Sequence, residues 1–125
     1  ALSPYFSSAR VRKLAFGVRD DLHALHESYP RLGAFKPADV RGGVCMQAAF
    51  AAAAASGNLC AADGSVLSAS TGAKGNRPSL STVCQLVLGK PLDKAMQMSD
   101  WDCRPLTREQ MRYAANDAHV LLRLH

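Results

Sequence analysis

The sequence predicts a mixed α/β domain, and three observations carry that expectation. Leu14, Phe16 and Val18 alternate along the chain, which indicates a strand because alternate side chains of a strand share one face. A helical pattern follows from about Asp20, and a longer one runs from Thr107 to the last residue. The expected order is a short helix or loop, a strand, a helix, a weak strand, an Ala/Gly/Ser-rich stretch and two helices.

The first long helix is expected to begin at two adjacent aspartates, Asp20 and Asp21. Acidic side chains are favourable there because the helix dipole places partial positive charge at the N-terminus. Leu22, Leu25 and Tyr29 continue at helical spacing, and the following proline ends the pattern. A weak strand is expected near residues 38–40.

The last helix has a clear start and a polar pair on one face. Thr107 and Gln110 have the spacing of a capping box. Tyr113 and Asp117 lie one turn apart, so both project from the same face. They border the predicted apolar stripe, which consists of Met111, Ala114, Ala115, Ala118, Leu121 and Leu122. A carboxylate beside a phenol can hold a metal ion and steer a water, which points to metal-assisted phosphodiester cleavage; the alternative is an ordinary surface pair.

The region from Ser79 onward resembles the C-terminal part of the DEDDy 3′–5′ exonucleases, which include ribonuclease D, the Werner exonuclease domain and the mut-7-like exonucleases. Residues 11–25 resemble the second motif of the same family, a strand that runs into a helix with an aspartate at its start. The C-terminal pieces that match, in order, are Leu80-Ser81, Leu88-Gly89, Leu92-Asp93-Lys94, Ser99-Asp100-Trp101, Arg104-Pro105-Leu106, Gln110 and Tyr113-Ala114-Ala115-Asn116-Asp117.

The resemblance implies a ribonuclease H-like (DnaQ-like exonuclease) fold, in which four acidic residues hold two divalent ions, Mg²⁺ or Mn²⁺. Asp21, in preference to Asp20, and Asp117 would be the third and fourth, and Tyr113 would position the attacking water. We therefore expect Asp21 and Asp117 to face each other across one cleft. The partner implied is the 3′ end of RNA or DNA, and no other cofactor is expected.

Three residues of the matched region are candidates for contact with that partner. Lys94 and Arg104 are the candidate phosphate contacts. Trp101 either stacks on a base or anchors its loop.

The chain departs from the family at its start, because residues 1–19 contain no acidic residue and hence no Asp-x-Glu, the family's first motif. We expect residues 1–125 to be a partial exonuclease domain that lacks the opening strands of the sheet and is inactive in this form. One alternative is a catalytically dead nucleic-acid-binding module of the same fold. Another is a helical interaction domain whose similarity is coincidental.

Residues 41–78 are predicted to be a low-complexity insertion. Met46–Ala55 has high helix propensity, and Gly57 could end that helix, whereas residues 61–79 favour a loop or disorder. The insertion either lies near a nucleic-acid cleft or is a tolerated surface segment.

The composition suits an intracellular nucleic-acid-binding protein. The formal net charge of +5 favours a polyanionic partner. The four cysteines are widely spaced and show no zinc-type grouping, so reduced thiols are expected. No apolar run approaches the length of a membrane span, and no membrane partner is expected.

Overall fold

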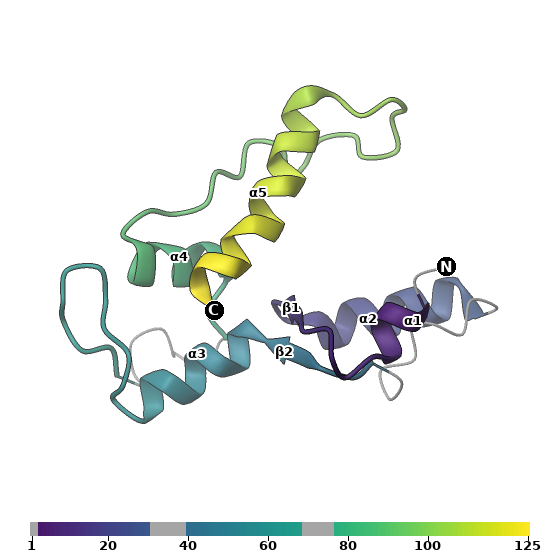
Figure 1. The fold of residues 1–125 in the computed structure, drawn as a ribbon. Helices are drawn as coiled ribbons and strands as arrows, with labels where there is room; N and C mark the ends of the chain where they lie inside the picture. Colours follow the sequence, from purple (N-terminus) through teal and green to yellow (C-terminus); the bar gives the residue numbers. More distant parts are fainter. Residues whose placement is uncertain (1–2, 31–39, 69–76) are drawn as a thin grey trace. The chain divides into compact units, whose positions relative to one another are not determined.

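The computed structural model describes residues 3–30, 40–68 and 77–125. These residues form five helices and two short strands (Figure 1). The chain divides into two compact units, residues 1–49 and 50–125. Within the described ranges, no helix combines the length and apolar character needed to cross a membrane.

Unit 1 contains a small parallel sheet with a helical crossover. Its elements are α1 (Ser3–Ser7), β1 (Lys13–Ala15), α2 (Val18–Ser28) and β2 (Gly43–Cys45), and β2 leads directly into α3 (Met46–Ala55). Leu14 of β1 lies opposite Val44 of β2 in a parallel register. Two parallel strands that are neighbours in a sheet need a crossover connection, and α2 lies within the connection between β1 and β2. The predicted α/β class is therefore confirmed.

A glycine sets the junction between β1 and α2. Gly17 is the N-cap of α2 and has φ of 69°, a left-handed conformation that other residues rarely adopt. The strand consequently ends at Ala15, and the helix begins at Val18 instead of near Asp20. The expectation that Phe16 and Val18 belong to the strand is therefore wrong.

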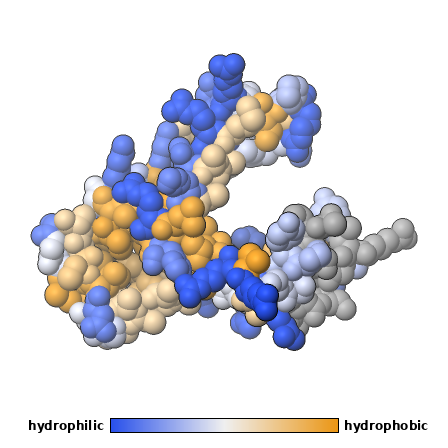
Figure 2. Space-filling model, viewed as in Figure 1, coloured by the Kyte–Doolittle hydropathy of each residue, from blue (hydrophilic) through white to orange (hydrophobic). Residues whose placement is uncertain are grey.

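Unit 2 is built around α4 (Leu80–Leu88) and α5 (Arg108–Leu124), which pack against each other. The segment 59–67 is held to α4, because the Ala62 N–H donates to the Leu86 carbonyl at 2.9 Å. Gly89 ends α4 with φ of 73° and turns the chain into a long segment that leads to α5. The buried apolar residues of this unit are Phe50, Ala54, Leu67, Val83, Cys84 and Val120. Figure 2 shows hydrophilic side chains projecting from α5, whereas the region of α3 is largely apolar.

The segment 41–78 holds more regular structure than its composition indicates. The predicted helix at Met46–Ala55 is confirmed as α3, and Gly57 follows it with φ of 68°. β2 also falls in this range and was not predicted there. The described residues after α3 form a loop with one isolated bridge, between Cys60 and Val66. The strand expected near residues 38–40 lies mostly outside the described residues, as does the stretch 69–76.

Most of the predicted apolar stripe of α5 is exposed in this structure, and only Leu121 of the stripe is half-buried. Met111 and Leu122 retain 51% and 69% of their accessible surface, and the three alanines of the stripe are also exposed. The buried residues are instead Gln110 and Val120, with Tyr113 half-buried on the same side. The reason is that α4 and the segment 89–107 pack on the edge of the helix that carries Tyr113.

Candidate active site on α5

The start of α5 is fixed by reciprocal hydrogen bonds. The Thr107 hydroxyl accepts from the Gln110 backbone N–H at 3.2 Å, and the Gln110 side-chain oxygen accepts from the Thr107 backbone N–H at 2.9 Å. The predicted capping box is therefore confirmed. These bonds fix the first residue of the helix that carries the polar pair further along.

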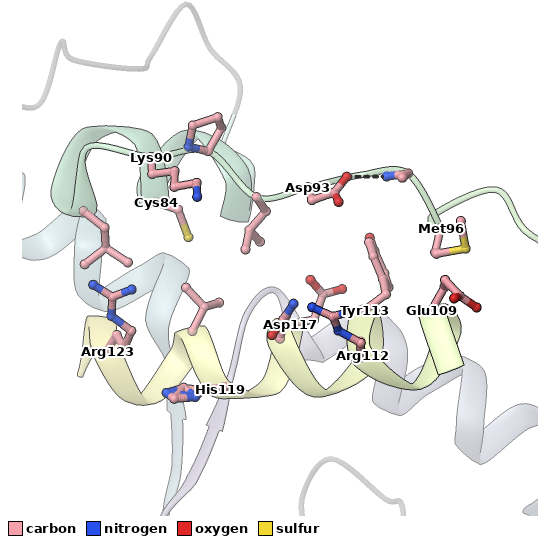
Figure 3. Close-up of a pocket in the computed structure, with 16 residues that line it drawn as sticks. Cys84, Lys90, Asp93, Met96, Glu109, Arg112, Tyr113, Asp117, His119 and Arg123 are labelled. Atoms are coloured by element: carbon pink, nitrogen blue, oxygen red, sulfur yellow. Dashed lines mark hydrogen bonds between the residues drawn. The ribbon is translucent and has the colours of Figure 1, made fainter. Parts of the chain in front are cut away.

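Tyr113 and Asp117 form that pair. Both side chains are half-buried, and they lie one turn apart on the same face of α5. Figure 3 shows both of them on the side of α5 that faces the segment carrying Asp93. The structure thus brings together two of the three predicted catalytic residues.

The electrostatics of the pair are set by partial burial. Burial raises the pKa of Asp117, and the neighbouring Tyr113 hydroxyl offsets only part of that rise. Burial, followed by the nearby charge of Asp117, raises the pKa of Tyr113. Tyr113 therefore stays a phenol at neutral pH and can donate to Asp117, while its oxygen keeps lone pairs that can accept from water.

The pair opens into a cavity of about 710 Å³ between α4, the segment 90–96 and α5. Lys90, Arg112 and Arg123 line it, as do the carboxylates of Asp93, Glu109 and Asp117 (Figure 3). The three cations formally balance the three carboxylates, so the protein alone gives the cavity no strong charge of either sign. Cys84, which is buried, also lines the cavity.

The third predicted catalytic residue, Asp21, lies in unit 1. It sits with Asp20 in the first turn of α2, and both side chains are exposed. Asp21 is therefore accessible to a ligand, but so is its neighbour, and the preference for Asp21 stays a prediction. The expected approach of Asp21 to Asp117 across one cleft also stays a prediction.

A divalent ion would find only part of a site in the residues described. Within ranges 3–30, 40–68 and 77–125, no group of three or more His, Cys, Asp or Glu side chains is placed to hold a metal. The chemistry of Asp117 nevertheless fits a hard cation. A carboxylate whose ionised form is disfavoured by burial gains from a neighbouring positive charge, and its oxygens are the donors that Mg²⁺ and Mn²⁺ prefer.

The candidate nucleic-acid contacts differ in how free they are. Lys94 is exposed on the segment between α4 and α5. Arg104 is also exposed, but one nitrogen of its guanidinium donates to the carbonyls of Trp101 and Cys103, at 2.7 and 2.8 Å. Arg104 therefore stabilises its own loop, and contact of either side chain with phosphate stays a prediction.

The structure favours one of the two alternatives considered for Trp101, and it adds a neighbour of Asp117 that was not foreseen from the sequence. The Trp101 indole N–H donates to the Met96 carbonyl at 3.1 Å, and its ring lies 5.9 Å from that of Tyr113, centroid to centroid, which supports the loop-anchor alternative. Cys84 lines the same cavity as Asp117, and its pKa is raised by burial and by the charge of that carboxylate. Spacing within one helix gave no signal for either contact, because both join different segments.

Comparison with known proteins shows that this chain is similar to nucleases. A family model described as "3'-5' exonuclease" matches residues 1–125. The human protein "Exonuclease mut-7 homolog" is 56% identical over 46 residues, which is 37% of this chain. "Exonuclease mut-7" of Caenorhabditis elegans is 30% identical over 120 residues, which is 96% of this chain.

Among solved structures, the Aedes aegypti Nibbler EXO domain covers 95% of this chain with a TM-score of 0.73 and 27% identity. This chain spans 51% of that domain, 5% of the human relative and 12% of the worm relative. The similarity in fold is thus to about half of a solved exonuclease domain.

Proposed function

The chain belongs to the 3′–5′ exonuclease family, and from that premise we propose that its residues hydrolyse phosphodiester bonds at the 3′ end of RNA or DNA. The observation that carries the proposal is the Tyr113–Asp117 pair, whose half-buried side chains line one cavity. Such a pair offers a ligand for a cation beside a phenol that can orient a water, which is what metal-assisted hydrolysis requires.

Each residue has a distinct role in this proposal. Asp117 and Asp21 hold divalent ions, Mg²⁺ or Mn²⁺, and Asp20 does not. When bound, a pair of such ions lowers the pKa of water and stabilises the departing oxygen. Tyr113 donates a hydrogen bond to Asp117 and accepts one from the attacking water. The bond from the water fixes the direction of the lone pair with which the water attacks. Lys94 contacts a phosphate of the substrate, and Arg104 keeps its loop in place and contacts a second.

Asp21 and Asp117 are two of four carboxylates, so we propose that the 125 residues alone show little or no activity with Mg²⁺ or Mn²⁺. A test is to join the N-terminal half of the mosquito EXO domain in front of this chain; we call this protein the fused domain. It should shorten a 5′-labelled oligonucleotide from its 3′ end in the presence of either ion. A fused domain that folds and binds Mn²⁺ but degrades nothing would favour the alternative of an inactive nucleic-acid-binding module.

The roles can be separated by substitutions in the fused domain. Asp117→Ala and Asp21→Ala should each reduce the rate by more than about 100-fold, since residues that merely support metal ligands already contribute about 10- to 100-fold. Asp20→Ala is the matched control for Asp21→Ala, because both side chains are exposed in the same helical turn, and it should retain activity. Tyr113→Phe should reduce the rate by about 10- to 100-fold. Mn²⁺ affinity, measured by calorimetry, should fall with Asp117→Ala and hold with Tyr113→Phe.

A further inference from the structure

Gln110 is the only buried polar side chain among the described residues, with 3% of its surface accessible. Its oxygen accepts from the Thr107 N–H, and its amide nitrogen donates to the Ser99 hydroxyl at 3.1 Å and to the Asp100 carbonyl at 2.7 Å. A glutamine amide has two N–H donors, and both are used here. Gln110 therefore closes the helix cap and also ties α5 to a segment ten residues earlier in the chain.

The segment that Gln110 holds is the one that carries Trp101. The indole N–H donates to the Met96 carbonyl at 3.1 Å, and the Ser99 hydroxyl donates to the same carbonyl at 2.9 Å. On the other side, Arg104 donates to the Trp101 carbonyl. These bonds fix the indole within its loop, but within this set only Gln110 fixes the loop to α5.

The fixed indole contacts the tyrosine of the candidate site. The ring centroids of Trp101 and Tyr113 are 5.9 Å apart and the rings are tilted by 52°, which is a favourable arrangement of two aromatic rings. Tyr113 follows Gln110 by three residues, so the two side chains project from neighbouring positions on one face of α5. The loop therefore returns to α5 at two points, an amide clamp at Gln110 and a ring contact at Tyr113.

We propose that Gln110, acting through Trp101, is a positioning residue that holds the Tyr113 ring in place beside Asp117. A movement of the 99–101 segment away from Gln110 takes the indole away from Tyr113, and the phenol then gains rotamer freedom. This inference rests on the proposed role of Tyr113 as the group that orients water. The attachment of the Trp101 loop to Gln110 can be tested without an assay of enzymatic activity.

The competing explanation is that Gln110 serves only as part of the helix cap, and Gln110→Glu separates the two. A glutamate at this position still accepts from the Thr107 N–H, because glutamate and glutamine both close a capping box. Its carboxylate has no N–H to donate to the Asp100 carbonyl, so the loop loses its anchor. Gln97→Glu is the matched control, since it adds the same charge at an exposed glutamine of the same loop.

The clamp can be followed in the 125-residue chain by fluorescence, because Trp101 is its single tryptophan. Gln110→Glu should shift acrylamide quenching of Trp101 toward the value for the chain in urea, and it should weaken energy transfer from tyrosine to Trp101. Helix content by circular dichroism should stay the same, and Gln97→Glu should change none of these readings. Unchanged quenching in Gln110→Glu would show that the amide does not hold the indole, and the inference would be wrong.

The consequence for chemistry is tested in the fused domain with a double-mutant cycle. Gln110→Glu should lower kcat by about tenfold with little change in KM, as for other groups that orient a catalytic residue. In a Tyr113→Phe background the same substitution should have no further effect on kcat, because its effect passes through the hydroxyl that is already absent. Equal losses in both backgrounds would refute the positioning role. A fused domain that is inactive before any substitution counts against the proposed function, and the fluorescence result then decides the clamp.

Discussion

The capping box predicts how much a single hydroxyl stabilises the helix that carries the candidate site. Thr107→Ala removes the oxygen that accepts from the Gln110 backbone N–H at 3.2 Å. The reciprocal bond, from the Thr107 N–H to the Gln110 side chain at 2.9 Å, needs only backbone atoms of residue 107 and persists. One N–H of the first turn is thus left to solvent, and such N-cap substitutions cost about 1 kcal/mol.

The magnitude can be checked by equilibrium urea denaturation of the chain, followed by circular dichroism. A loss of about 1 kcal/mol lowers the ratio of folded to unfolded molecules by about fivefold. Thr107→Ser is the control, because serine retains the hydroxyl, and it should lie within a few tenths of a kcal/mol of the original chain. If Thr107→Ser destabilises as much as Thr107→Ala, the lost methyl and not the cap explains the result, and the reasoning fails.

Two further predictions concern groups whose pKa is shifted in the folded chain. Burial raises the pKa of Asp117 above its ordinary value of 3.8. This carboxyl therefore contributes its full stabilisation of the folded state at pH values below 3.8. That contribution is lost as the pH rises through the higher pKa of the folded state. Asp117→Asn should therefore raise the melting temperature at pH near neutral and change it less in acid; a constant difference across pH would contradict this. Two thiols have pKa values shifted in opposite directions. Burial raises the pKa of Cys45, but hydrogen bonds from backbone N–H groups, that of Ala48 foremost, outweigh burial and lower this pKa overall. For Cys84, burial raises the pKa. Iodoacetamide should alkylate Cys45 well before Cys84 when both are followed by mass spectrometry, and the reverse order would contradict the assignment.

Two features that depend on neighbours in sequence were predicted correctly from the chain. The capping box of Thr107 and Gln110 joins residues three apart, and it forms as expected. The helix at Met46–Ala55 follows from propensity and a terminating glycine, Gly57. In both cases the interacting groups lie within one or two turns, so the sequence contains all the information that the local structure needs.

Features that depend on distant segments were not predictable. β2 has only three residues, and it exists because Val44 pairs with Leu14, thirty residues earlier. The buried side of α5 was predicted from a stripe of one methionine, three alanines and two leucines, yet the segment 89–107 packs on the side that carries Gln110 and Tyr113. Helical spacing gives the direction in which each side chain points but not which direction the rest of the unit covers.

That Asp21 and Asp117 both hold divalent ions is the central proposal for this chain, and a crystal structure of the fused domain grown with Mn²⁺ tests it most directly. The anomalous signal of manganese locates each ion independently of the protein atoms. We predict manganese in contact with oxygens of both Asp21 and Asp117, with the Tyr113 hydroxyl beside the site. Manganese bound at Asp117 while Asp21 points into solvent, or while Asp20 takes its place, would contradict the assignment.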